Sequence, residues 1–520
     1  MEYFVNKTTK ILRIILLIFC ILQCVFYFSI DTIVGCVVSL LAFEFFVRYV
    51  YKVNSIKNRP LAFLAMVGLQ FFTYFAPILT FVEGHPLTYN MISPIETFLW
   101  QFLYFIITLI AFNRSSRHTP VKCINKILNN IGYFSPLGNK TLWVLGFCGI
   151  LGRVYLLDNQ YGEETTAGAG TISIFVLPFL VAPYCILFKQ LFTNSDTSVS
   201  KFNRFLLVCY SIVIIGMGIA SNSRNSIVTI FMTVILMSFI YCIYHREDII
   251  ESIIKVSFNK LFAFIFTLIL IGIPLTHFAV AMVAVRYMRS DIGASELLKE
   301  TIDLAMDSER MAQINAVINK VEDGKSIKVT DLKSEWSEDY ISNVFFNRIC
   351  NYQVADASIY HAKKAGIPCD DMIDFSIISL KLIFPAPIVK ILFGNIRKQD
   401  YEFSPMDKLY ACSQKTTVFP SYIVGGDVGL GLAVFGYLFP IFQYLIYYMI
   451  FRYMDHLICW RKGRIVFPLL SLIGVYGFFF TFMVGSGIAP RLYGFFYSIP
   501  IGIFIKTIIA RTINKIFYKK

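Results

Sequence analysis

Twelve apolar runs restrict what this chain can fold into more than any other feature. A bilayer core of about 30 Å needs about 20 apolar residues per helix, and lipid offers no partners to an open backbone. The ten-residue alternation of a membrane barrel is absent from the sequence. We therefore predict an all-α polytopic membrane protein with about 12 transmembrane helices. The runs lie at about 11–30, 33–51, 61–82, 93–112, 141–157, 171–193, 203–220, 226–244, 261–284, 428–451, 465–486 and 491–511.

The basic residues predict the orientation of these helices. The formal net charge is +14. If the N-terminus is cytoplasmic, most Lys and Arg residues fall in cytoplasmic connections, as the positive-inside rule requires. An even number of spans then places the C-terminus in the cytoplasm too, and the net charge predicts no nucleic-acid partner. The first run lacks a small-residue cleavage site, so we interpret it as an anchor.

One long segment interrupts the alternation of spans and divides the chain into three parts. Residues 1–285 hold the first nine spans, residues 286–427 form a loop on the outer side, and residues 428–520 hold the last three. The loop is too long to be bare, so we expect a helical periplasmic domain. Two helices are predicted in it, from Ser295 to a stop before Gly324 and from about Ser337 to Lys364.

The outer segment also contains an apolar run at 374–395 that is nearly long enough to span. Pro385 and Pro387 cut it into pieces that are too short to cross a bilayer. A full crossing would also move the basic residues after the tenth span to the outside. We therefore expect an interfacial or re-entrant element at the outer surface.

Cysteine and histidine spacing indicates neither a metal site nor a disulfide framework. Most of the 12 cysteines lie inside apolar runs, and no CxxC or His/Cys ligand spacing occurs in the sequence. Three cysteines of the outer segment, Cys350, Cys369 and Cys412, leave room for one disulfide. We predict no metal and no cofactor.

Four arginines, Arg224, Arg286, Arg289 and Arg491, adjoin the outer ends of apolar helices. Each alone fits a side chain that reaches from the helix to the interface. Arg286 and Arg289 are three apart on one helical face, while Ser223 and Asn225 flank an arginine at a helix start. Guanidinium groups and a helix N-terminus together suit a pyrophosphate, so the pattern points to a lipid diphosphate on the outer side.

Other polar residues have both a structural and a functional interpretation. On the second outer helix Arg348 and Asp356 share a face, from which His361 is rotated away; a solvated polar face is the simpler interpretation. Glycines and Asp427 stand where the chain enters the tenth span, and the glycines further along suit helix packing. Glu44 and Arg48 are four apart and are expected to pair with each other.

Three short motifs carry a resemblance to a known family. They are SNSRNS at 221–226, RYMRSD at 286–291 and VFPSYIVGGDVGLGLAVFGYL at 418–438. Together with the twelve spans and the late outer segment, they resemble the Wzy-type O-antigen polymerases, which polymerise oligosaccharide repeat units in the bacterial inner membrane. Many relatives have a motif closer to P-S-x-x-G-E, and PSYIVGGD here places Asp427 where their acid stands.

The resemblance implies a GT-C-like membrane fold with a periplasmic active site. It also implies a metal-independent glycosyltransferase that joins undecaprenyl diphosphate-linked oligosaccharides into O-antigen or a similar surface polysaccharide, and a chain-length regulator is a possible partner. An O-antigen ligase or another lipid-linked-sugar transferase is the alternative within the same chemistry. A flippase for the same lipids is the alternative of another class; its charges should line a central cavity, and the near-absence of charge inside the helices argues against it.

The residues with candidate functions form three groups under this interpretation. Cations would stabilise the leaving pyrophosphate and a base would serve the acceptor hydroxyl. The pyrophosphate-binding candidates are Arg224, Arg286 and Arg289; the catalytic candidates are Asp356, His361 and Asp427; and the further substrate-binding candidates are Arg348, Arg491, Asn225 and Ser223.

Overall fold

The computed structural model describes most of the chain. The residues described are 1–117, 122–161, 164–165, 175–192, 199–220, 224–245, 281–282, 285, 294–307, 309–310, 352–382, 384, 386–394, 396, 401, 403–416, 424–461, 464–482, 487, 491–492 and 494–518.

Within this part, eight helical segments are long and apolar enough to cross a membrane. They are α1 (Glu2–Phe26), α2 (Ile30–Tyr49), α4 (Pro60–Val82), α5 (Pro94–Ser115), most of α9 (Lys201–Ala220), most of α10 (Arg224–His245), the segment Asp427–His456 and the segment Gly494–Phe517 that contains α25 (Ile499–Phe517). The predicted membrane protein is thus confirmed in its class. The predicted ninth run lies almost wholly outside the described residues.

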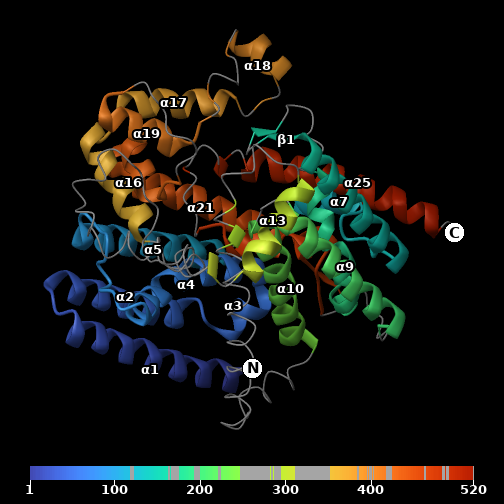
Figure 1. The fold of residues 1–520 in the computed structure, drawn as a ribbon, viewed down its shortest axis with the longest axis horizontal. Coiled ribbons are helices and arrows are strands. Elements are labelled where there is room, and N and C mark those ends of the chain that lie inside the picture. Colours follow the sequence, from blue (N-terminus) through green and yellow to red (C-terminus); the bar gives the residue numbers. More distant parts are fainter. Residues whose placement is uncertain are drawn as a thin grey trace.

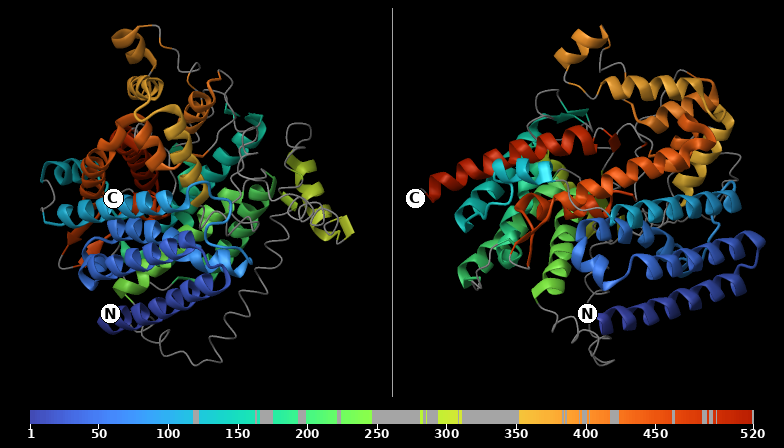
Figure 2. Two further views of the ribbon diagram at one scale, coloured as in Figure 1. Left: turned by 90° about the vertical axis from the view of Figure 1, so that its left-hand side faces the viewer. Right: turned by 180° about the vertical axis from the view of Figure 1, so that it is seen from behind.

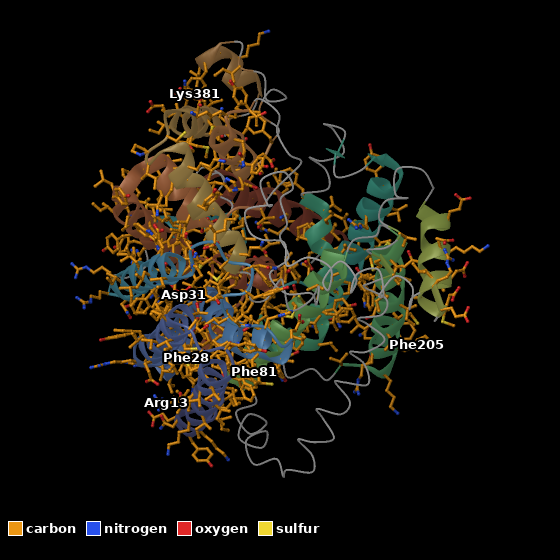
Figure 3. The ribbon with its side chains drawn as sticks, turned by 60° about the vertical axis from the view of Figure 1, so that its left-hand side comes forward. Arg13, Phe28, Asp31, Phe81, Phe205 and Lys381 are labelled. Atoms are coloured by element: carbon orange, nitrogen blue, oxygen red, sulfur yellow. The ribbon has the colours of Figure 1, made fainter. Side chains whose placement is uncertain are left out.

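Apolar side chains on the outside of the molecule agree with a lipid environment. Phe28 and Phe205 are 78% and 65% exposed, and Figure 3 shows Phe205 on the outside of α9. In water such faces would be costly, because each exposed apolar side chain keeps its area in contact with solvent. In a bilayer they are the surface that faces the acyl chains.

Two of the predicted spans differ in form from a regular α-helix. Residues 177–191 form a 3₁₀ helix, η1 (Leu177–Leu191), in which Pro183 removes a backbone donor. The eleventh run begins in strand β4 (Arg464–Val466) and continues as two short helices, α22 (Leu469–Ile473) and α23 (Val475–Phe479). The prediction of one continuous helix over 465–486 was wrong in its described part, and the break between the two short helices falls at Gly474. The fifth run forms α7 (Asn139–Asn159).

The N-terminal helices stack in layers, and α5 ends this stack beside α21 (Phe439–His456). Figure 1 shows α1, α2 and α5 as successive layers with α21 beyond α5. The contacts between α5 and α21 advance together along both helices, from Tyr104 with Tyr447 to Phe112 with Phe451. The two helices therefore run parallel, as the twelve-span scheme requires of its fourth and tenth spans.

The predicted tenth span is a helical hairpin rather than one helix. Asp427 begins α20 (Asp427–Phe435), yet its carboxylate accepts a hydrogen bond of 3.0 Å from the Tyr447 hydroxyl. A straight helix would hold residues 20 apart about 30 Å from each other. The chain turns back at Gly436, whose φ of +57° favours glycine. The expectation of a single helix over 428–451 is corrected accordingly.

The outer segment supplies a small helical cluster next to α20. It consists of α16 (Tyr352–Ala365), α17 (Asp370–Lys381) and α19 (Pro405–Gln414), with α18 (Ala386–Phe393) beyond them in Figure 1. As predicted, α16 stops at Gly366, where φ is +108°. The run at 374–395 is also divided as predicted, since α17 ends at Lys381 and α18 starts at Ala386. The first predicted outer helix is represented by α13 (Ala294–Met306).

Close packing of α16 on α20 depends on glycine. A Cβ atom at Gly429 would lie directly against the backbone carbonyl of Ser358, and one at Gly426 would lie 2.8 Å from Ala355 Cα. The Gly426 amide donates a 2.7 Å hydrogen bond to the Ser358 hydroxyl. These contacts confirm a packing role for Gly429, and they give Gly426 a packing role as well.

Substituting Gly429 by alanine is expected to destabilise this cluster by about 1–3 kcal/mol, because the two helices must separate to admit the methyl group. Gly216→Ala is the matched control, since nothing lies within 4 Å of a Cβ at that position in α9. Thermal unfolding of the two purified variants measures the difference. Equal melting temperatures would show that α16 and α20 are not packed as described.

Segments predicted to be cytoplasmic contact one another, as the orientation scheme requires. The Tyr244 hydroxyl donates to the Lys57 carbonyl at 2.7 Å, and Arg511 donates to the Ile131 carbonyl at 2.8 Å. We call residues 52–59, 122–134 and 455–461 the connector cluster. It contains α3 (Val53–Asn58), α6 (Lys122–Asn130) and strand β3 (Cys459–Arg461), which pairs antiparallel with β4. In a connection predicted to lie on the outer side, a second short ladder joins β1 (Gln160–Tyr161) to β2 (Glu164–Thr165).

One expected pairing and one possible disulfide differ from the sequence interpretation. Glu44 accepts two hydrogen bonds from Arg13 of α1, so its predicted pairing with Arg48 is wrong. A planar guanidinium on the neighbouring helix can bind both carboxylate oxygens. Cys369 and Cys412 are both free thiols, and Cys350 lies outside the described residues.

Candidate functional site

The carboxylate of Asp427 is the centre of a buried polar cluster. Its Oδ2 atom accepts hydrogen bonds from the hydroxyls of Tyr104 at 2.8 Å and Tyr447 at 3.0 Å, and it forms an ion pair with Arg491. The backbone N–H of Gly487 donates to Oδ1 at 3.3 Å. Asp427 is 8% exposed and Arg491 5%. A buried carboxylate with four donors, one of them a cation, is held in one orientation.

Three helices, α5, α20 and α21, bring Tyr104, Asp427 and Tyr447 of this cluster together. The hairpin turn at Gly436 returns Asp427 to the middle of α21, where Tyr447 lies. The parallel packing of α5 then sets Tyr104 beside Tyr447, and their hydroxyls are 2.6 Å apart. Each tyrosine places its ring among apolar side chains and its hydroxyl on the acid, which is the arrangement that allows tyrosine to be buried in a membrane protein.

Arg491 is the cation of this cluster. Besides Asp427 it donates to the carbonyl of Thr481, and its guanidinium lies 5.5 Å from the ring centre of Tyr447 and 5.7 Å from that of Phe482. Ring faces carry negative charge density, so both contacts favour the cation. The sequence predicted Arg491 for substrate binding and Asp427 for catalysis, and the structure brings the two together.

Arg491 also belongs to the wall of a cavity of about 740 Å³. Two further cations, Arg153 of α7 and Lys506 of α25, line the same cavity. Apolar residues of η1, α10, α22, α23 and α25 form most of the remaining wall, together with a few hydroxyl groups, and no Asp or Glu of the described residues lines it. We call this the cationic cavity. An apolar cavity with cations in its wall suits an amphiphile with an anionic group.

Asp356, the second predicted catalytic acid, lies at the N-terminus of α5. Its carboxylate accepts from the backbone N–H groups of Ile92 and Ser93 and, at 2.7 Å, from the hydroxyl of Thr97. Burial raises the pKa of Asp356, while these three donors oppose that rise. The contacts are those of a capping residue supplied by another helix, because they satisfy N–H groups that a helix N-terminus leaves open.

His361, the predicted alternative base, packs between α16 and α19. Its Nδ1 atom lies 2.7 Å from the Ser413 hydroxyl, and that hydroxyl donates to the Tyr410 carbonyl at 2.7 Å. Nδ1 therefore carries the proton in this contact. Burial, aided by the charge of Lys364, lowers the pKa of His361 to about 4. The three predicted catalytic residues thus have three separate sets of partners.

The pKa of His361 predicts a dependence of stability on pH. Above pH 6.5 the imidazole is neutral in both the folded and the unfolded chain, so it contributes no pH dependence there. Between pH 6.5 and about 4 the unfolded chain binds the proton first, so this residue is expected to lower stability by up to about 3 kcal/mol. Thermal unfolding of wild type and His361→Gln from pH 7 to 4 measures this. Parallel curves would contradict the assignment.

The predicted pyrophosphate clamp lies largely outside the described part of the chain. Ser223, Arg286, Arg289 and Arg348 are not described. Arg224 and Asn225 open α10, as the sequence predicted, while their side chains lie outside the description. The meeting of Arg224 with Arg286 therefore stays a prediction.

Several site residues were missed by the sequence interpretation. Tyr104 and Tyr447 stand inside apolar runs that contain many aromatic residues, and no spacing marks them. Arg153 and Lys506 were not among the candidates, whereas the structure places both on the cavity wall. A charged residue inside an apolar run was the available signal for Lys506, because such residues are costly in lipid and face a protein interior.

A second buried ion pair was also unexpected. Arg59 donates from Nε to both carboxylate oxygens of Asp455, and it donates to the Phe112 carbonyl and the Ser115 hydroxyl at 2.7 Å each. The guanidinium lies 4.6 Å from the centre of the Phe112 ring. This pair joins α4, α5 and α21 in the connector cluster.

Comparison of the chain with protein-family models, with curated proteins and with solved structures finds no match.

Proposed function

We propose that this protein is a membrane glycosyltransferase that polymerises undecaprenyl diphosphate-linked oligosaccharide repeat units into O-antigen or a similar surface polysaccharide. The observation that carries the proposal is the cationic cavity, in which Arg153, Arg491 and Lys506 line an otherwise largely apolar space within the helices. The proposal places the reaction on the periplasmic side of the bacterial inner membrane, with both termini in the cytoplasm.

The charge and size of the cavity support a lipid diphosphate as ligand. Arg491 is paired with Asp427, but Arg153 and Lys506 also line the wall and no described acid does, so the cavity favours an anion. The apolar wall favours the chain attached to that anion. A volume of about 740 Å³ is within the range of about 300–1,000 Å³ for small-molecule sites, so it suits a headgroup and the first part of a prenyl chain rather than a whole undecaprenyl group.

The proposed reaction requires a site that stabilises the negative charge on its leaving group. The acceptor hydroxyl oxygen bonds to the anomeric carbon of the donor glycan, and the bond from that carbon to the diphosphate oxygen breaks. The polyprenyl diphosphate leaves with the electron pair and takes up the proton that the hydroxyl loses. Charge develops on the diphosphate, so cations held at that position lower the barrier. Arg491 is proposed for this role, with Arg224, Arg286 and Arg289 as further candidates.

Asp427 is proposed as the residue that positions Arg491. Its carboxylate is fixed by Tyr104 and Tyr447 and is paired with the guanidinium. A guanidinium held in this way keeps its direction, which reduces the reorganisation needed when the leaving group forms. The contacts of Asp356 and His361 favour structural roles for these two residues.

A ligase and a flippase are the two alternative functions, and one experiment distinguishes them from a polymerase. A ligase would use the same lipid diphosphate chemistry on a different acceptor. One observation favours a lipid-linked oligosaccharide flippase. The near-absence of charge inside the helices argued against this function in the sequence, but charged side chains do line a cavity among the helices, as a transporter requires.

The glycolipids that accumulate when the gene is deleted distinguish the three functions. We expect single repeat units, joined to the lipid or capped onto the cell-surface lipid, with no polymer. Long polymer left unattached would indicate a ligase. Lipid-linked units retained on the cytoplasmic side would indicate a flippase. Expression of the wild-type chain in the deletion strain is the control, and it should restore polymer.

A further inference from the structure

A second cavity, in the connector cluster, has a different chemistry from the cationic cavity. Its volume is about 720 Å³, and four asparagines line it. Asn54 and Asn58 are one turn apart on α3, and Asn125 and Asn129 are one turn apart on α6. Two helices thus each contribute a pair of amides to one cavity, which we call the amide pocket.

Charge in the amide pocket is balanced. Among the described residues, the charged ones that line it are Arg59 and Asp455, which form the ion pair described above. Paired charges of opposite sign have little net attraction for an anion or a cation. The cationic cavity differs, since Arg153 and Lys506 line its wall in addition to Arg491, which is paired with Asp427, and no described acid lines it. The amide pocket therefore selects for a neutral ligand.

An aromatic platform stands at the same cavity. Trp460 lines the amide pocket and is 52% exposed, although a tryptophan is large and apolar. Strand β3 holds its backbone opposite Ile465 in the antiparallel ladder with β4. An exposed indole offers a flat face to the C–H groups of a ligand, while its N–H stays available as a donor.

We propose that the amide pocket is a binding site for a neutral glycan. Each asparagine amide is both donor and acceptor, so it matches a hydroxyl group, which is also both. Four such groups suit a ligand with many hydroxyls, and the indole face suits the apolar side of a sugar ring. This site is separate from the proposed transferase site, and the inference does not depend on that function.

A thin layer separates the two cavities. Tyr133 and Leu457 line the cationic cavity, whereas the next residue in each case, Phe134 and Ile458, lines the amide pocket. The Tyr133 and Ser471 hydroxyls are 2.7 Å apart, and Ser471 donates to the Leu457 carbonyl at 2.7 Å. This hydrogen-bonded layer keeps a ligand of the amide pocket away from the three cations.

Saturation-transfer NMR on the full-length protein in lipid nanodiscs tests this site. Nanodiscs replace glycoside detergents, whose sugar headgroups would compete. The probes are free neutral oligosaccharides of hexoses, N-acetylhexosamines and deoxyhexoses at up to millimolar concentration. At least one is expected to give a saturable signal, and Trp460→Ala and the double variant Asn58→Ala with Asn129→Ala are each expected to weaken binding at least tenfold.

Asn130→Ala is the matched control, because this exposed asparagine of α6 does not line the pocket. It should bind like wild type. The substituted asparagines and Trp460 are exposed, so the variants should melt at the wild-type temperature. Three results would overturn the proposal: no probe binds wild type, binding is unchanged in the pocket variants, or inorganic pyrophosphate displaces the sugar.

Discussion

Replacing Arg491 with glutamine is expected to abolish polymer formation and to lower stability by about 3–5 kcal/mol. The stability loss arises because Asp427 would remain as a buried carboxylate without its cation. The activity loss has a separate cause in our account, since the leaving diphosphate would lose the cation that faces it. A single substitution cannot separate the two causes.

A double variant separates them. Asp427→Asn together with Arg491→Gln removes both charges and leaves no unpaired buried charge, so most of the lost stability should return. Polymer should still be absent, because the guanidinium of Arg491, which is proposed to face the leaving diphosphate, has been removed. Thermal unfolding in nanodiscs and polymer length in cells provide the two measurements. If the double variant makes polymer of wild-type length, the ion pair is purely structural.

Replacing Arg59 with methionine is expected to lower stability by about 3–5 kcal/mol as well. Asp455, the Phe112 carbonyl and the Ser115 hydroxyl would all lose their charged donor inside the protein. Unlike Arg491, Arg59 has no part in the proposed reaction. Whatever folded protein remains should therefore polymerise normally per molecule.

Arg13→Met is the matched control for that experiment. Arg13 forms the same type of ion pair with Glu44, but the two side chains are 44% and 46% exposed. Exposed pairs contribute about 1 kcal/mol or less, since water competes for both charges. Thermal unfolding should thus separate the two arginine variants clearly. Equal losses would show that Arg59 and Asp455 are not buried as described.

The sequence predicted the class of the protein and many boundaries of its elements because these depend on local composition. Apolar runs marked the spans, Gly366 marked the end of α16, and Pro385 and Pro387 marked the division of the run at 374–395. In each case the signal is contained in a few neighbouring residues: the length of an apolar run, the missing donor of proline, or the positive φ that glycine accepts.

The hairpin and the ion pairs depend on contacts between distant residues, and no local pattern reports them. The segment from Asp427 to His456 is apolar throughout, so its reversal at Gly436 resembles a continuous helix in composition. Asp427 and Arg491 are 64 residues apart. Glu44 had a partner at the favourable spacing of four, yet Arg13 on the next helix binds both of its oxygens.

The candidate site was predicted in part for the same reason. Arg491 attracted notice as a cation at the outer end of a helix, and Asp427 as an acid in a resembling motif. Tyr104 and Tyr447, which hold the acid, could not be distinguished among the 30 tyrosines and 51 phenylalanines of the chain. The cavity wall also joins α7, η1, α10, α22, α23 and α25, so it exists only in the folded protein.

Reconstitution of the purified protein with a lipid diphosphate-linked repeat unit tests the central claim most directly. The measurement is the length of the glycan product and the amount of polyprenyl diphosphate released, in nanodiscs and in the presence of a chelator. Our account predicts glycans of two or more repeat units, with one polyprenyl diphosphate released for each bond formed. Intact substrate with no release, under conditions in which the protein binds that lipid, would contradict it.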